Sequence, residues 1–168
     1  GEMMDKNEIL ADLLLLGDTS ADALEQPGKN LFNKGKDVFH TLKQYKHDMD
    51  DFNKYAADNN YLTPNVDRYY HTAAMYDAVR GDPTKAAIAF IMGLGKEAKD
   101  IIKYSFTKNP VYAAKESIKD MQNNINGIYQ SFLSDKPAEE NPQIKQLQTP
   151  TMIDIMPMYK ALKNENRQ

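Results

Sequence analysis

Apolar residues recur at steps of three and four through the middle of the chain, a spacing typical of amphipathic helices. It predicts helices over residues 36–58, 66–80, 83–106 and 111–132 that share one core. The first of these has the most regular apolar seam, which indicates a core-facing helix, with a coiled-coil partner as the alternative. This seam consists of Val38, Leu42, Tyr45, Met49, Phe52 and Ala56.

The second and third helices should form a tight hairpin, because Gly81-Asp82-Pro83 combines a helix stop with a helix start. Glycine adopts the left-handed conformation that ends a helix, aspartate caps the next helix, and proline is tolerated at its first position. Thr63 or Asn65 is expected to cap the first helix of this hairpin. The second is expected to bury Ala87, Phe90, Leu94, Ala98 and Ile101.

Two glycines, Gly93 and Gly95, interrupt this second helix. Each costs about 1 kcal/mol of helix stability relative to alanine. The usual reason to accept that cost is the close approach of another backbone, which is therefore predicted here.

The two ends of the chain differ from its middle. Residues 6–16 form an apolar helical pattern that either covers the core or binds a partner. Residues 134–150 contain three prolines and few apolar residues, which predicts an extended linker. The methionine-rich residues 152–162 are then either a strap packed over the bundle or an arm for a neighbouring subunit. The predicted fold is thus all-α, a four-helix bundle-like core (29–133) with a short N-terminal helical arm (1–28) and a Pro-containing C-terminal tail (134–168).

Composition excludes several functions. The net charge of −3 gives no electrostatic case for nucleic acid, and the absence of cysteine excludes disulfides and thiol catalysis. No secretory signal is visible, and the longest apolar run, residues 13–16, is far too short to span a bilayer. His40 and His47 lack a convincing third ligand, so we interpret them as solvated and expect no metal. No cofactor motif appears, so no cofactor is expected.

Polar residues of the hairpin and the last helix are the candidate site. Asp67 and His71 are four residues apart, as are Lys96 and Asp100, so each pair shares a helix face. One interpretation is a buried network that holds the helices in register. The other is catalysis by His71, Glu97, Asp120 and Asn124. The network is favoured, because no serine, cysteine or metal set stands in recognisable relation to the histidine. Its members are Asp67, His71, Lys96, Glu97, Asp100, Asp120 and Asn124.

Two motifs carry a family resemblance. Residues 67–71 read D-R-Y-Y-H and residues 117–127 read S-I-K-D-M-Q-N-N-I-N-G, and in both the chain resembles serum amyloid A, an acute-phase, lipoprotein-associated family. The resemblance covers roughly residues 30–127. The matching residues are Asp67, Tyr69, His71, Tyr76, Asp77, Ala78, Pro83, Glu97, Ser117, Asp120, Asn124 and Gly127, with Arg68, Tyr70, Arg80 and Lys96 as conservative counterparts and Phe52 and Tyr55 at the family's aromatic positions.

The resemblance implies a small four-helix bundle that self-associates, binds lipid or apolar ligands, and is secreted if this chain is like the family. The family's aromatic N-terminus and Arg-rich character are missing, so a microbial or phage relative is an equal candidate. We therefore expect a non-enzymatic, self-associating binding protein whose partner is an apolar small molecule, a lipid or a protein surface. The alternative is a hydrolase-like microbial effector that uses His71 and Glu97. The resemblance points away from an enzyme.

Overall fold

The protein is all-α, as the sequence predicts. The computed structural model describes residues 21–62, 65–105 and 110–167, and these contain no strand. The predicted helix at residues 6–16 and the candidate cap Thr63 lie outside the described residues. The elements are α2 (Ala21–Asp58), α3 (Val66–Val79), α4 (Pro83–Ser105), α5 (Pro110–Ser131), the 3-10 helix η1 (Ala138–Glu140), α6 (Pro142–Lys145) and α7 (Pro150–Asn166).

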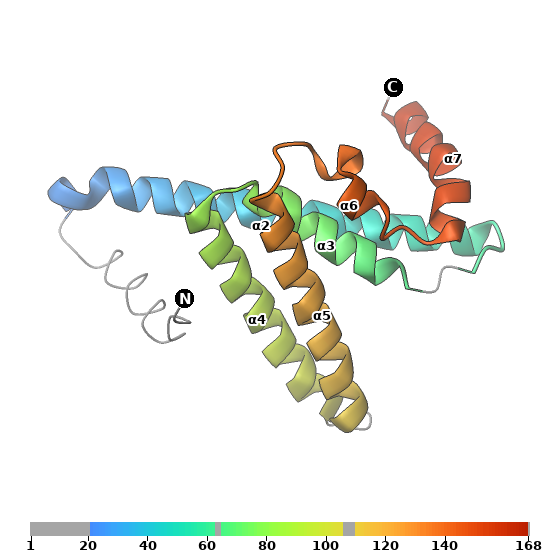
Figure 1. Ribbon diagram of the computed structural model, residues 1–168, viewed down its shortest axis with the longest axis horizontal. Coiled ribbons are helices and arrows are strands. Elements are labelled where there is room, and N and C mark those ends of the chain that lie inside the picture. The colour runs from blue at the N-terminus through green and yellow to red at the C-terminus, as the bar shows by residue number, and fades with distance from the viewer. Residues whose placement is uncertain (1–20, 63–64, 106–109, 168) are drawn as a thin grey trace.

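Helix α3 lies at the centre of the fold. Ten of its 14 residues are buried, on every side of the helix, because α2, α4, α5, η1 and α6 all contact it. A helix that is apolar around its whole circumference is stable in water only when it is enclosed in this way. Figure 1 shows α2 running beside α3, while α4 and α5 form an antiparallel pair that crosses them.

The joint between α3 and α4 is as tight as predicted. Arg80 and Gly81 both adopt the left-handed conformation, with φ of 47° and 75°. The Asp82 carboxylate then accepts hydrogen bonds from the backbone N–H groups of Thr84 (2.9 Å) and Lys85 (3.2 Å). These contacts satisfy backbone groups that the helix itself leaves unpaired. At the other end of α3, Asn65 occupies the N-cap position but its side chain makes no capping hydrogen bond.

The first helix is longer than predicted. It begins at Ala21 and continues through Pro27 and Gly28, where the sequence predicts a boundary between arm and bundle. Proline removes one helical hydrogen bond but does not oblige a helix to end. The apolar seam of this helix does face the core, with Val38, Phe52 and Ala56 fully buried.

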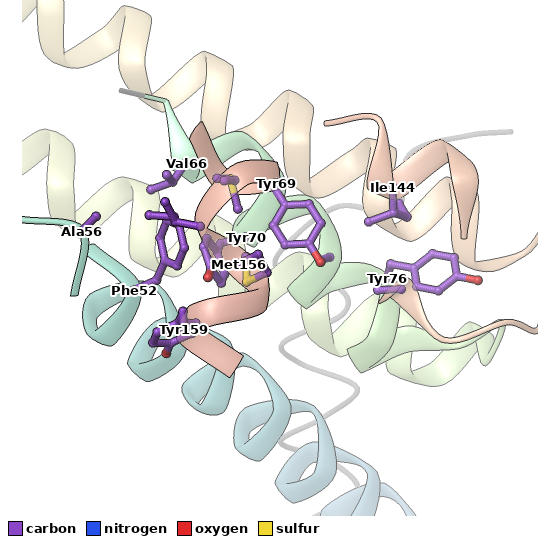
Figure 2. Close-up of a cluster of buried hydrophobic side chains, with 13 residues drawn as sticks. Phe52, Ala56, Val66, Tyr69, Tyr70, Tyr76, Ile144, Met156 and Tyr159 are labelled. Atoms are coloured by element: carbon purple, nitrogen blue, oxygen red, sulfur yellow. The ribbon is translucent and has the colours of Figure 1, made fainter. Parts of the chain in front are cut away.

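The apolar core has two parts rather than the single predicted one. Figure 2 shows the larger part, where side chains from α2 and α3 meet side chains of the C-terminal segment. The smaller part joins α2, α3 and α4, with Ile128 of α5 packed against it. The larger cluster contains Phe52, Ala56, Val66, Tyr69, Tyr70, Ala73, Tyr76, Ala138, Ile144, Met152, Ile155, Met156 and Tyr159.

The predicted inward face of α4 is wrong. Ala87 and Ala98 are exposed, and Phe90 and Leu94 are only half-buried, while the Ile101 side chain lies outside the described residues. Between Pro83 and Asp100, the residues that α4 buries are Ile88, Ala89, Gly93 and Glu97. Gly93 lies against the Asn124 side chain of α5, and Glu97 lies one turn further along the same face.

The C-terminal tail is folded rather than extended. Its prolines predict a linker over residues 134–150, but η1 and α6 form there, since Ala138 and Ile144 bury their side chains completely. Asn141 caps α6 by accepting a hydrogen bond from the Gln143 N–H at 2.9 Å. Helix α7 then packs over the bundle through Met152, Ile155, Met156 and Tyr159. The sequence left two alternatives for residues 152–162, packing over the bundle or contacting a neighbouring subunit. In this structure the segment packs over its own bundle.

Two aspartates accept hydrogen bonds that hold the C-terminal segment against α2 and α3. The Asp77 carboxylate of α3 accepts hydrogen bonds from the Tyr45 hydroxyl and from the Ala138 N–H. The Asp48 carboxylate of α2 accepts one from the Tyr159 hydroxyl at 2.8 Å. Hydrogen bonds to charged acceptors are worth about 1.5–3 kcal/mol each. The tail therefore adds polar anchors as well as apolar surface to the bundle.

Among the glycines of the described helices, Gly127 of α5 makes the closest contact with another helix, and the glycines of α4 do not. A Cβ atom on Gly127 would lie 2.4 Å from the Thr72 backbone oxygen. A Cβ on Gly93 would meet only the ends of two side chains, and one on Gly95 would meet nothing within 4 Å. The predicted backbone contact is therefore wrong for α4, and α5 carries it instead.

Gly127→Ala should destabilise the protein by about 1–3 kcal/mol, because the helices cannot keep their separation around an added methyl group. Gly95→Ala is the matched control and should stabilise it by about 1 kcal/mol, the ordinary gain of helix propensity. Urea unfolding of both variants measures the difference. Two changes of the same sign would contradict the proposed role of Gly127.

Candidate functional site

A central cavity of about 620 Å³ opens between α2, α3, α4 and α5. This volume is within the range of about 300–1,000 Å³ that small-molecule sites occupy. Every one of the four helices contributes to the wall, so the cavity exists only in the packed bundle. It is lined by Phe39, Leu42, Lys43, Tyr45, Lys46, His47, Met49, Tyr70, His71, Ala74, Met75, Met92, Gly93, Lys96 and Asn124.

The inner wall follows from the α3–α5 contact. With Gly127 pressed against Thr72, the residue one turn earlier on α5, Asn124, points at α4. Its Nδ2 would lie 2.9 Å from a Cβ on Gly93, and the Met75 methyl group would lie 3.3 Å from the same position. The missing side chain at Gly93 therefore makes room for Asn124 and Met75. It is the reason that a glycine is accepted inside α4.

Two buried polar atoms at the cavity wall have no hydrogen-bond partner. They are the Tyr70 hydroxyl and the Asn124 Oδ1, on side chains of residues only 2% and 6% exposed. A buried polar group left unpaired costs about 1–3 kcal/mol. Burial raises the pKa of Tyr70, so its hydroxyl stays protonated and able to donate. Both residues line the cavity, although these two atoms are themselves covered by protein.

Three lysines line the cavity, namely Lys43, Lys46 and Lys96, and no carboxylate is among the described lining residues. Within the described part of the chain, none of the three forms an ion pair within 4 Å. Lys96 interacts electrostatically with Glu97 and Asp120 of the neighbouring network. The cavity therefore combines a largely apolar interior with lysines at its rim, of which Lys43 and Lys46 belong to α2.

The predicted polar network lies beside this cavity and shares His71 and Lys96 with it. Burial lowers the pKa of His71, and the neighbouring Lys96 lowers it further against the opposing pull of Asp120, Asp67 and Asp100. The imidazole is therefore mainly neutral at pH 7. Asp67, Lys96, Asp100 and Asp120 thus lie close enough to influence His71, but Asp67 and Lys96 are exposed, so this part of the predicted network is not buried.

Glu97 is the most buried acid of this network, at 3% exposure. Burial raises its pKa, and repulsion from Asp120 raises it further, while a hydrogen bond from the Ser117 hydroxyl opposes the shift. Burial likewise raises the pKa of Asp120, against the opposing attraction of His71. Both carboxyl groups are therefore kept from ionising as readily as they would in water.

Sequence reasoning found part of this site and missed part. Asn124 was expected to join the network, but its buried Oδ1 has no hydrogen-bond partner, and the residue lines the cavity instead. The lysines of α2 and the methionine Met92 were missed, because a cavity wall depends on how four helices pack and leaves no mark on one helix alone. His40 and His47 are exposed, as predicted, although His47 also lines the cavity.

A second hollow, of about 600 Å³, lies between α2 and α7 and is mostly polar. Apart from Arg167, its charged side chains pair with one another. Lys160 pairs with Glu139 at 3.7 Å, and Lys163 pairs with Asp48. The central cavity is therefore the stronger candidate for a ligand site.

The described residues contain no group of three or more His, Asp or Glu side chains arranged to hold a metal ion. None of the helices in this part of the chain has the length and hydropathy required to cross a membrane. Comparison of the chain with protein-family models, curated proteins and solved structures finds no match.

Glu97→Gln should stabilise the fold at alkaline pH and leave it unchanged in acid. Because the folded pKa is raised above the ordinary value of 4.5, the unfolded chain loses this proton first as the pH increases. Stability is therefore lost as the pH rises through the folded pKa. The amide of glutamine can still accept from Ser117 and carries no charge.

Thermal melts of wild type and variant between about pH 4 and about pH 8 test this linkage. The Tm of Glu97→Gln minus that of wild type should grow with pH. The exposed Glu140→Gln serves as the control, with a flat difference. A difference for Glu97→Gln that does not change with pH would show that burial of the charge is not the cause.

Proposed function

We propose that the protein is a non-enzymatic helical binding protein whose central cavity takes an apolar ligand. The observation that carries this proposal is the cavity itself, which combines apolar walls with the two unpartnered buried polar atoms of Tyr70 and Asn124. Natural ligand sites have this composition, a largely apolar surface with a few placed polar groups. A stable scaffold alone gains nothing from leaving such groups unpaired.

The arrangement of His71 and Glu97 supports binding over hydrolysis. His71 lines the cavity, but Glu97 is not among the lining residues and its carboxyl group is engaged by Ser117. A general acid–base pair must reach the same substrate atoms within hydrogen-bond distance. The two side chains face different surroundings, so they are poorly placed to act together.

The resemblance of residues 30–127 to serum amyloid A favours the same function. That family is one of helical bundles that bind lipid or apolar ligands. The match includes Tyr70 and Lys96 as conservative counterparts and Asn124 as a matching residue, and all three line the central cavity. We therefore infer a relationship to this scaffold together with its type of ligand.

Ala74→Leu should weaken binding of a neutral fluorescent probe, N-phenyl-1-naphthylamine, at least about tenfold, which is about 1.4 kcal/mol. Ala74 lines the cavity and is 7% exposed, so the larger side chain occupies the ligand's volume. Leu42→Trp, on the opposite wall, is a second filling variant in case the first folds poorly. Probe fluorescence measures the affinity.

Ala57→Leu is the matched control, because Ala57 is exposed near the end of α2. It should bind the probe like wild type. Wild-type protein that binds no probe would refute the proposed function, and so would unchanged affinity in both filling variants.

We also propose that two copies of the chain associate through the outer face of α5. Ile118, Ile125 and Phe132 are seven residues apart and are 55%, 50% and 48% exposed, and Tyr129 lies among them at 60%. Exposed apolar patches of this kind mark interaction surfaces. An antiparallel pairing keeps the Lys115 end of each helix away from the same end of its partner, which favours a symmetric dimer.

Ile125→Glu should shift the protein toward a smaller species in sedimentation velocity, because the charge would lie at the centre of the interface. Ile153→Glu is the matched control, since Ile153 is 57% exposed on α7, away from this face. The control should sediment like wild type. A wild-type protein that is monomeric at high concentration would contradict the proposed dimer.

A further inference from the structure

The positive rim of the central cavity has a geometry that the proposed function does not explain. Lys43 and Lys46 are three residues apart on α2 and so lie on neighbouring positions of one helix face. Lys96 belongs to α4 and lines the same cavity from another wall. An apolar ligand without charge would gain nothing from the ammonium groups of Lys43 and Lys46, whereas Lys96 also interacts with Glu97 and Asp120.

Other lysines of the described chain show what a lysine does when an acid is close. Lys34 pairs with Asp82 at 2.8 Å, and Lys54 pairs with Asp58 at 2.9 Å. No carboxylate lines the cavity to serve Lys43 or Lys46 in this way. An anionic group on a ligand could form ion pairs with these lysines. Charge-assisted hydrogen bonds of this type are stronger than hydrogen bonds between neutral groups.

The apolar part of the cavity suits a flexible chain. Its walls include Met49, Met75 and Met92, and methionine adapts to irregular apolar shapes without selecting one. Phe39 lies at the mouth, 59% exposed, with the Lys43 ammonium 6.0 Å from its ring centroid. An apolar chain passing over Phe39 would therefore bring its head group beside Lys43.

We propose that the central cavity binds a single-chain amphiphile with an anionic head group, of the fatty-acid class. The chain lies between the methionines, and the carboxylate lies at the rim formed by Lys43, Lys46 and Lys96. Tyr70 and Asn124 add two polar side chains to the otherwise largely apolar lining. This inference rests on the proposed function and adds the ligand's chemical class.

Carboxylates near the site act against this selectivity and define the opposite outcome. Asp67, Asp100 and Asp120 all influence His71 from the network side. If they controlled the potential inside the cavity, a cationic amphiphile would bind better than an anionic one. The cavity lining itself holds none of them, so the lysines are expected to dominate.

Competition by three amphiphiles of equal chain length tests the proposal. Dodecanoate, dodecan-1-ol and dodecylammonium are titrated, each below its micelle concentration, against protein loaded with N-phenyl-1-naphthylamine. Dodecanoate should compete about tenfold more strongly than the alcohol, because its carboxylate can pair with several lysines, each of which contributes modestly at a partly exposed site. Added salt should reduce this advantage by screening.

The Lys43→Met/Lys46→Met double variant and Lys96→Met should lose the preference for dodecanoate and keep the affinity for dodecan-1-ol. Lys99→Met is the control, because Lys99 is an exposed lysine of α4 that does not line the cavity. It should behave like wild type. Loss of alcohol binding in the lysine variants would show a general defect of the cavity, which would overturn the assignment of a head-group site.

The experiment distinguishes an error in the proposed anionic head group from an error in the proposed apolar ligand site. Equal competition by all three amphiphiles, or a preference for dodecylammonium, would keep an apolar ligand site and overturn the anionic head group. No binding of probe or alcohol would refute the proposed function itself. Displacement of the probe by a peptide of residues 6–16, with no displacement by dodecanoate, would assign the cavity to this acidic apolar segment and overturn the amphiphile.

Discussion

The contact between Gly127 of α5 and the Thr72 backbone of α3 is the constraint on which the rest of the bundle depends. No other residue type fits there, since even a Cβ atom would lie 2.4 Å from the Thr72 oxygen. Close packing at this point fixes the position of α5 along the axis of α3. It therefore also fixes where Asn124 reaches α4 and where the polar residues of α5 meet those of α3. The core of the fold and the wall of the cavity have a common geometric origin.

The same packing explains why the bundle carries two kinds of interior. On the side of the C-terminal segment, aromatic and aliphatic residues fill the space around α3, and Tyr159 packs edge-on against Phe52 with ring centroids 5.4 Å apart. On the side of α4 and α5, the smaller apolar cluster lies beside a buried acid, Glu97, a neutral histidine and an unfilled cavity. Buried charges and unpaired polar groups lower stability. Their concentration on one side of the molecule is what distinguishes the candidate site from the scaffold.

Much of the fold was readable from the sequence, and the reasons are local. The seam of α2 and the Gly81-Asp82-Pro83 joint depend on periodicity and on capping chemistry within a few residues. The inward face of α4 was not readable, because its most apolar side is turned away from the core and Glu97 is turned inward. The polar cluster was found through i and i+4 pairs, whereas the cavity and its lysines depend on the spacing between four helices.

Methionine methyl groups offer the most direct measurement of the central claim, that the cavity is a ligand site. Met49, Met75 and Met92 line the cavity, whereas Met152 and Met156 lie in the other apolar cluster. Titration of methyl-labelled protein with dodecanoate, followed by NMR, reports on both groups in one sample. The account predicts saturable shifts of the three cavity methyls and little change at Met152 and Met156. Equal shifts at all methionines, or shifts at Met152 and Met156 alone, would contradict it.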